Sequence, residues 1–408
     1  MRRIAAGLAA SALAAACALG TAAAEKDDPN SVLKAFVEAR NEIRGTEETE
    51  SAEAAPEDEA LRILSEMTLE EKTAQMFIVV PETFSESSPT TSADEAFERA
   101  YRERPAGGFI FFEGNVESYG QTKEMLSQIE RISKERTGLP AFACIDEEGG
   151  RVARVSGRLA EFPAVPSAET LGMSGPQASF EAGERIGEAL SELGFSVDFA
   201  PVADVSSNPA NSVIGDRSFS SDPEQAATAV EAFVLGLKSQ GVLATLKHFP
   251  GHGDAAEDSH YSAAVSMKTL DEMRGFELIP FKAGIDAGAD FAMTAHVTYP
   301  NADGSGLPAS LSDSLTEGLL RNELGFDGII VTDALNMTAV SDGRTPAETA
   351  VAAVEAGCDV LLMPEDFEAA RRGLLDAVSN GTVSEERINE SVERIIRKKL
   401  EWENERRR

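Results

Sequence analysis

Cysteine and basic residues are scarce in this chain. Only three cysteines occur among 408 residues, and Cys144 and Cys358 each lie in a short apolar stretch. We expect both to be buried as small hydrophobic residues rather than joined in a disulfide. Lysine and arginine number 37 against 70 aspartates and glutamates, which gives a formal net charge of −33. So large a negative charge repels nucleic acids and anionic membrane surfaces, and neither is an expected partner.

The apolar run near the N-terminus, residues 4–20, is too short and too rich in alanine for a membrane span. Two arginines precede it and three consecutive alanines follow it, as in a secretory signal that is removed before Glu25. A second interpretation stays open, because LAAAC, ending at Cys17, resembles the site at which a lipoprotein is lipidated. Both interpretations predict an exported protein. The first gives a signal peptide over 1–24, and the second gives a lipoprotein signal that ends at Cys17, whose lipid would be the only contact of the protein with a membrane.

An acidic stretch separates this segment from the rest of the chain. Residues 25–58 are rich in glutamate, alanine, serine and threonine and are expected to be a disordered linker. A folded domain is expected over 59–408. Leu61 to Met67 has a helical pattern, and the sequence Thr-Leu-Glu-Glu from Thr68 has the form of a capping box that begins a second helix.

Eight apolar stretches typical of buried strands follow, separated by helical patterns such as that of 314–325. The strands are expected at 74–80, 107–112, 141–146, 195–205, 242–249, 290–297, 327–334 and 358–364. Alternating strands and helices imply parallel pairing through right-handed crossovers, and eight such strands can close a barrel. The sequence therefore predicts an α/β fold, a single (β/α)₈ TIM barrel. The alternative, an open doubly wound sheet, lacks a glycine-rich dinucleotide loop after the first strand.

Three of the four histidines lie in one stretch, KHFPGHGDAAEDSH at 247–260. Its glycines and proline end the strand before it, so a polar loop follows the carboxyl end of that strand. In a barrel, such ends line the active-site mouth. The polar residues there are Asp146, Asp204, Lys247, His248, His296 and Asp333, with Arg154 and Arg217 in nearby loops. Carboxylates and cations that converge on one mouth suit a polyhydroxylated substrate, because each hydroxyl can both donate and accept.

Five motifs carry a resemblance to glycoside hydrolase family 3, especially its bacterial β-N-acetylhexosaminidase branch: DEEGGRVAR, NSVIGDRSF, KHFPGHGDAAEDSH, FAMTAHV and GFDGIIVTDALNM. The resemblance implies a retaining exo-enzyme that removes β-linked GlcNAc from peptidoglycan fragments or chito-oligosaccharides. It implies that Asp333 is the nucleophile and that His260, held by Asp258, is the acid/base. It also implies that the sugar is bound by Asp146, Arg154, Arg217, Lys247 and His248. No metal or organic cofactor is expected.

Other interpretations of these residues stay open. A metal-dependent hydrolase could take nitrogen and oxygen ligands from His248, His252, Asp254, Asp258 and His260. A non-catalytic sugar-binding lipoprotein is the second alternative. Within the barrel interpretation, His252 and Asp254 are expected to shape the loop and Asp204 to support it. His296 is either a buried supporting group or a ligand contact.

Overall fold

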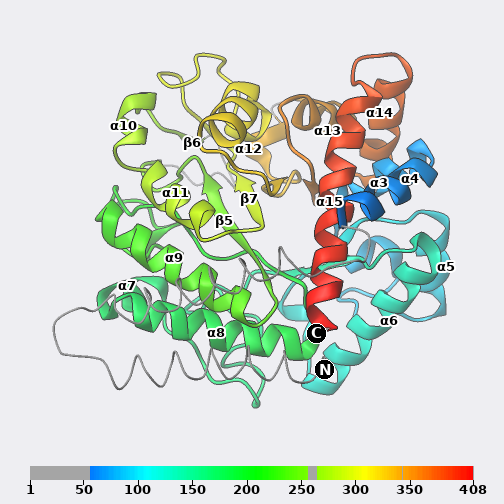
Figure 1. Ribbon diagram of the computed structural model, residues 1–408, viewed down its shortest axis with the longest axis horizontal. Coiled ribbons are helices and arrows are strands. Elements are labelled where there is room, and N and C mark those ends of the chain that lie inside the picture. Colours follow the sequence, from blue (N-terminus) through cyan, green and yellow to red (C-terminus); the bar gives the residue numbers. More distant parts are fainter. Residues whose placement is uncertain (1–55, 256–263, 342, 408) are drawn as a thin grey trace.

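The computed structural model describes residues 56–255, 264–341 and 343–407. Within them, eight parallel strands are paired in the order β10-β1-β2-β3-β4-β5-β7-β9. Figure 1 shows the neighbouring strands β5 and β7 among the helices. The strands are β1 (Phe77–Val79), β2 (Gly108–Phe111), β3 (Phe142–Ile145), β4 (Val197–Asp198), β5 (Leu243–Phe249), β7 (Phe291–Thr294), β9 (Ile329–Thr332) and β10 (Leu361–Leu362). Each overlaps a stretch that the sequence predicted. The predicted leader, Cys17 and the acidic linker up to residue 55 lie outside the described residues.

The two ends of this strand order meet and close the barrel. β10 pairs with β1, with Phe77 opposite Leu361. On its other side, the segment leading into β10 meets β9, where Val331 and Val360 form a parallel bridge. The N–H of Thr332 donates to the carbonyl oxygen of Val360 at 3.0 Å. The predicted (β/α)₈ barrel is thus confirmed, and the open doubly wound sheet is excluded.

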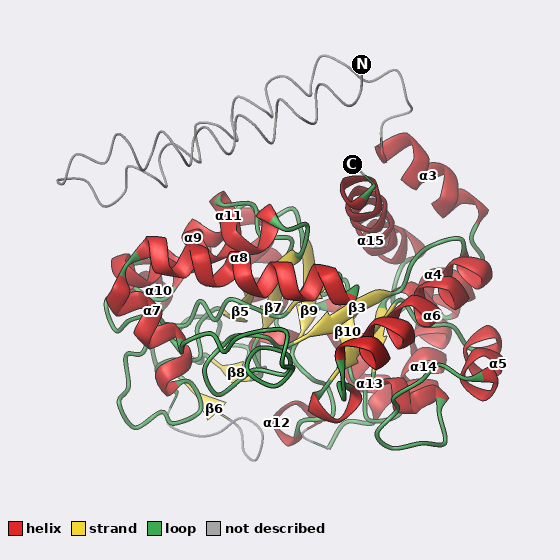
Figure 2. Cartoon of the chain, turned by 90° about the horizontal axis from the view of Figure 1, so that it is seen from below, coloured by secondary structure: helices red, strands yellow, loops and turns green. Residues whose placement is uncertain are grey.

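Helices in the connections surround the strands (Figure 2). Those between β1 and β10 are α5 (Glu95–Glu103), α6 (Tyr119–Thr137), α7 (Ala168–Ser174), α8 (Pro176–Leu193), α9 (Pro223–Ser239), α10 (Leu270–Arg274), α11 (Leu278–Asp286), the π-helix η5 (Ser314–Glu323), α12 (Thr338–Ser341) and α13 (Pro346–Glu355). Helix α9 packs against both α8 and α11, so these three form one continuous outer wall. The helix predicted over 314–325 is present, but its hydrogen bonding is of the π type. None of the helices described here is long and apolar enough to cross a membrane.

The chain enters the barrel through α3 (Pro56–Glu66) and α4 (Leu69–Gln75). The predicted capping box is confirmed, since the N–H of Glu71 donates to Thr68 Oγ1 at 3.2 Å and the N–H of Thr68 donates to Glu71 Oε2 at 3.1 Å. Helix α3 is described from Pro56 onward, so it extends to the N-terminal side of the predicted start at Leu61.

The last two helices, α14 (Phe367–Ser379) and α15 (Glu385–Arg406), follow β10. Helix α15 covers the end of the barrel where the strands begin. Its Lys399 Nζ, which is buried, donates to the carbonyl oxygen of Gly107 and to Gln75 Oε1, each at 2.7 Å. Its Lys398 pairs at 3.0 Å with Asp290, just before β7, and its Arg394 pairs at 3.2 Å with Asp359, just before β10. This end is therefore closed by structural contacts, which leaves the carboxyl ends of the strands for function.

One local prediction needs correction, and one pair of strands was not predicted. The fourth strand was expected over 195–205, but β4 ends at Asp198, and the pairing resumes only as an isolated bridge from Val202 to Lys247. Pro201 lies between them and has no N–H to donate to a ladder. A small parallel pair, β6 (Ala264–Val265) with β8 (Val297–Thr298), was not predicted. The cysteine prediction is confirmed, because Cys144 and Cys358 are both free and buried.

Candidate active site

Lys247 lies at the centre of an ion-pair cluster at the carboxyl end of the barrel. It is carried by β5 and is only 2% exposed. Its Nζ lies 2.7 Å from Asp146 Oδ1 and 2.6 Å from Glu148 Oε1, both just after β3. Asp146 keeps 23% of its side chain exposed, so it is the member of the cluster that is open to the mouth.

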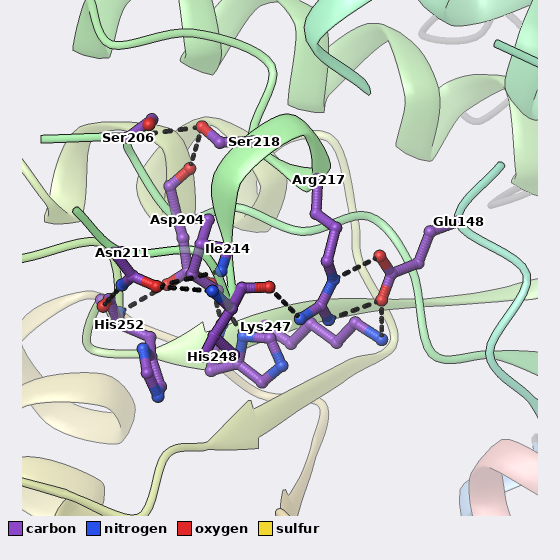
Figure 3. A network of polar contacts seen from close by, with 12 residues as sticks. Glu148, Asp204, Ser206, Asn211, Ile214, Arg217, Ser218, Lys247, His248 and His252 are labelled. Carbon is purple, nitrogen blue, oxygen red and sulfur yellow. Dashed lines mark hydrogen bonds and ion pairs between the residues drawn. The ribbon is translucent and has the colours of Figure 1, made fainter. Parts of the chain in front are cut away.

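Arg217 extends the cluster from the loop after β4 (Figure 3). Its Nε and Nη2 donate to the two oxygens of Glu148, at 2.8 and 2.7 Å, and its Nη1 donates to the carbonyl oxygen of Val213 at 3.1 Å. Burial alone would raise the pKa of Glu148, but Lys247 and Arg217 hold that pKa well below its ordinary value. Burial likewise opposes the charge on Lys247, yet Asp146 and Glu148 outweigh it and raise the pKa of the amine. Glu148 and Lys247 are therefore both ionised at neutral pH.

A second buried glutamate, Glu147, shapes the loop that carries Arg154. Its carboxylate accepts hydrogen bonds from the main-chain N–H groups of Arg154 at 2.5 Å, and of Val155 and Ser156 at 2.9 Å each. Its own N–H donates to Asp198 Oδ1 at 2.9 Å. The loop is thus folded around one carboxylate. The guanidinium of Arg154, partly exposed, makes no hydrogen bond or ion pair with any described residue, so it is available to a ligand.

His248 and the segment that follows it are held by Asp204, after β4. His248 Nδ1 lies 2.7 Å from Asp204 Oδ2, and the N–H of His252 donates to Asp204 Oδ1 at 2.6 Å. Asp254 is bound within the loop, because Ser266 Oγ donates to its Oδ2 at 2.9 Å. The imidazoles of His248 and His252 meet edge to face, with centroids 5.9 Å apart. These contacts agree with loop-shaping roles for His252 and Asp254.

Asp333 follows β9 directly and is half-buried. Its N–H donates to the carbonyl oxygen of Thr294 at 3.0 Å, and its Oδ1 accepts the N–H of Ala334 at 2.8 Å. These bonds to the neighbouring strand and to the next residue fix the carboxylate at the end of β9.

His296 packs beside this carboxylate. Its Nδ1 lies 2.7 Å from Ser310 Oγ and its Nε2 lies 3.0 Å from the carbonyl oxygen of Ala334. Both ring nitrogens are used within the protein, so of its two expected roles His296 fills that of a buried supporting group. Burial lowers the pKa of both His296 and His252, although the negative charge of Asp333 opposes this in each case. Asp333 therefore lies beside the neutral imidazole of His296.

The fold brings most of the residues that the sequence singled out to one end of the barrel. Those placed there are Asp146, Arg154, Arg217, Lys247, His248 and Asp333. Asp258 and His260, the expected acid/base pair, lie outside the described residues. Two important residues were missed: Glu148, which pairs with both buried cations, and Glu147. The signal was the run of three acids in DEEGG, because buried cations need counter-charges.

Metal binding finds no support in the part of the chain that the structure covers. Within 56–255, 264–341 and 343–407, no group of three or more His, Cys, Asp and Glu side chains is arranged to hold a metal ion. Asp258 and His260, two of the five ligands weighed for a metal-dependent hydrolase, are not in those ranges. Elemental analysis of the purified protein decides that alternative.

Comparison with known proteins places the chain in a family. The model for the glycosyl hydrolase family 3 N terminal domain matches residues 68–398. A beta-hexosaminidase of Stenotrophomonas maltophilia is 38% identical over 261 residues, which cover 63% of this chain and 75% of that protein. Beta-hexosaminidase A of Pseudoalteromonas piscicida is 35% identical over 316 residues, 72% of this chain but only 53% of that protein.

A solved structure agrees with these relatives. The family 3 beta-N-acetylglucosaminidase from Paenibacillus sp. str. FPU-7 superposes with a TM-score of 0.77 at 38% identity, covering 84% of this chain and 63% of that one. This chain thus spans about half of the Pseudoalteromonas relative and under two thirds of the Paenibacillus structure. Because the family match extends over most of its length, the chain belongs to glycosyl hydrolase family 3.

Proposed function

We propose that this protein is a retaining exo-β-N-acetylhexosaminidase that removes terminal β-linked GlcNAc. The observation that carries the proposal is the position of Asp333, a half-buried carboxylate at the end of β9, at the same end of the barrel as the Asp146–Lys247–Glu148–Arg217 cluster. The names of the relatives, beta-hexosaminidase and beta-N-acetylglucosaminidase, support the choice of sugar.

In the proposed reaction, a carboxylate oxygen of Asp333 attacks the anomeric carbon while the bond to the leaving oxygen breaks. His260, oriented by Asp258, gives its proton to that oxygen. The ester between the sugar and Asp333 is then hydrolysed by water, whose proton returns to His260, so both groups are restored. A histidine suits both steps because its pKa lies near neutral pH.

The binding residues have complementary tasks in this proposal. Asp146 accepts hydrogen bonds from sugar hydroxyls, and Lys247 beside it donates to a sugar oxygen. Arg154 reaches the sugar with a guanidinium that no described residue engages. Glu148 stays in the wall and keeps Lys247 and Arg217 in place. Since Lys247 is ionised, its hydrogen bond to the sugar is charge-assisted and stronger than a neutral one.

We further propose that the protein is exported, by cleavage before Glu25 or as a lipoprotein modified at Cys17. The substrates would then be GlcNAc-ended peptidoglycan fragments or chito-oligosaccharides outside the cytoplasm. Product analysis with both substrate types distinguishes them. The carbohydrate is the one partner proposed.

The function is tested with a nitrophenyl β-GlcNAc glycoside and with a 5-fluoro glycosyl probe. The wild-type protein should hydrolyse the glycoside, and the probe should label Asp333 in peptide mass spectra. Asp333→Asn should reduce turnover to background with unchanged unfolding behaviour, since an amide cannot form the ester. Binding without turnover in the wild type would favour the sugar-binding lipoprotein, and labelling of another carboxylate would overturn the choice of nucleophile.

A further inference from the structure

Asp204 is a buried carboxylate that connects two parts of the site. It is 1% exposed and lies in the connection after β4. Its Oδ2 lies 2.7 Å from His248 Nδ1 and accepts the N–H of His248 at 3.2 Å, while its Oδ1 accepts the N–H of His252 at 2.6 Å (Figure 3). Ser218 Oγ also donates to the main-chain oxygen of Asp204 at 2.7 Å. One side chain thus orients an imidazole and fixes the start of the segment after Pro250.

The charge of Asp204 decides where the proton of His248 lies. Burial would raise the pKa of Asp204, but the neighbouring His248 and its hydrogen bond lower that pKa below its ordinary value. An ionised carboxylate can only accept hydrogen bonds. At 2.7 Å from it, Nδ1 of His248 must therefore carry a hydrogen. If the imidazole is neutral, the other nitrogen, Nε2, is then an acceptor, whereas in an imidazolium it would be a donor.

Nε2 of His248 is the atom left for a ligand. No described residue makes a hydrogen bond to it, whereas Nδ1 and the main-chain N–H are both used by Asp204. The adjacent residue in β5, Lys247, can only donate. The pair Lys247 and His248 therefore presents a donor and an acceptor from consecutive positions. As an acceptor, Nε2 can bind a sugar hydroxyl, which donates its hydrogen, but not a sugar oxygen that carries no hydrogen.

We propose that Asp204 is a positioning residue that holds His248 as the Nδ1-protonated tautomer, so that Nε2 accepts a hydrogen bond from one hydroxyl of the bound sugar. The inference rests on the proposed function for the identity of the ligand. It assigns to Asp204 a part in substrate selection, beyond the support of the loop that the sequence led us to expect. It also explains why the same carboxylate binds His252, because the imidazole and the loop are then fixed by one anchor.

The first test needs no turnover. With only four histidines in the chain, the ring nitrogens can be followed by NMR of protein labelled with ¹⁵N-histidine, and His248→Gln identifies the signals of His248. The wild type should show a protonated Nδ1 and an unprotonated Nε2. In Asp204→Asn, an amide that accepts from His252 must turn its NH₂ toward His248, so Nδ1 should become the acceptor. A wild-type His248 protonated at Nε2, or an unchanged tautomer in Asp204→Asn, overturns the proposal.

The second test measures selection among sugars. Aryl β-GlcNAc glycosides lacking the 3-, 4- or 6-hydroxyl should include one for which wild-type kcat/KM falls about 5–10-fold, the usual effect of one hydrogen bond. For Asp204→Asn the same substrate pair should differ about twofold or less. Equal discrimination by both proteins refutes the proposal. If the wild type does not turn over the unmodified GlcNAc glycoside, the proposed function fails, but the NMR result still decides the role of Asp204.

Asp290→Asn is the matched control. Asp290 is also a buried aspartate, and its Oδ2 accepts the N–H of Ala244 at 3.1 Å, but it lies at the opposite end of the barrel with Lys238 and Lys398. Its substitution should lower stability while the tautomer of His248 and the discrimination among deoxy sugars stay as in the wild type. A purely structural loss would affect both variants alike, so the difference between them isolates the positioning role.

Discussion

Glu148→Gln tests whether the buried cations depend on the glutamate that the sequence did not single out. Glu148 contacts Lys247 Nζ at 2.6 Å and Arg217 at 2.7 and 2.8 Å, and all three side chains are largely buried. Glutamine has the same shape but one of its two terminal groups is a donor. If its oxygen stays near Lys247 and Arg217 Nη2, its NH₂ faces the N–H of Arg217 Nε. The substitution therefore removes a negative charge and places one donor, the NH₂ of glutamine, opposite another, the N–H of Arg217 Nε.

The expected cost follows from these contacts. Removing one partner of a buried ion pair costs about 3–5 kcal/mol. Asp146 still pairs with Lys247 at 2.7 Å, and Val213 still accepts from Arg217 at 3.1 Å, so we expect about 3 kcal/mol, near the lower limit. That loss corresponds to roughly a hundredfold change in the unfolding equilibrium. Lys247 and Arg217 should also lose their fixed positions, so kcat/KM for a GlcNAc glycoside should fall.

Urea denaturation at pH 7 measures the change in unfolding free energy, with Glu113→Gln as a control. Glu113 pairs with Arg158, but both side chains are exposed, and such pairs contribute little. The pH dependence gives a further check. The folded-state pKa of Glu148 is depressed, so its contribution is present above its unfolded pKa of about 4.3 and is lost as the pH falls below that value. Equal stabilities of Glu148→Gln and Glu113→Gln at pH 7 would refute the reasoning.

Three further predictions concern other parts of the chain. His260→Ala should lower kcat/KM about 10²–10⁴-fold for sugar-linked substrates. The loss should be clearly smaller for nitrophenyl glycosides, because their nitrophenolate leaves without protonation; equal losses would contradict a general acid. Burial lowers the pKa of Lys399 to about 7, so its folded form releases a proton before the unfolded chain does. The unfolding free energy of the wild type should therefore rise relative to that of Lys399→Met by up to about 1.4 kcal/mol per pH unit above pH 7. If urea denaturation gives the same difference between the two proteins at pH 7 and pH 9, this is excluded. Cys17→Ser should release the protein from the membrane fraction of its host only if Cys17 is lipidated; retention argues against the lipid anchor.

The sequence predicted the barrel because the pattern of apolar and polar residues that marks each strand and helix is local. Each strand is a short apolar run bounded by helical periodicity, and the capping box at Thr68 depends on residues three positions apart. Even the error in the fourth strand has a local cause, since Pro201 interrupts the pairing. The pair β6 and β8 was not predicted because β6 has only two residues and, unlike the equally short β4 and β10, lies outside the eight apolar stretches.

The site was predicted less completely, because its supporting contacts join residues far apart in the chain. Motif residues such as Lys247 and Asp333 stand out by their place at strand ends. The contacts that hold them do not, since Glu148 contacts Arg217 from another loop, and Asp204, expected only to support the loop, also contacts the imidazole of His248. In a chain with 70 acidic residues, the run of three acids in DEEGG was the one local sign, and it did not show which cations these residues contact.

Three buried carboxylates in this site hold in place the groups that are expected to bind the substrate. Glu147 folds one loop around three main-chain N–H groups, Glu148 fixes two cations, and Asp204 fixes an imidazole and the start of another loop. Each is almost fully buried, and each accepts hydrogen bonds from groups that carry or border the residues expected to bind sugar. Supporting contacts of this kind determine whether a binding group is held in its productive position. It follows that transferring only Asp146, Lys247, His248 and Asp333 to another barrel would leave the cations and the imidazole without their anchors.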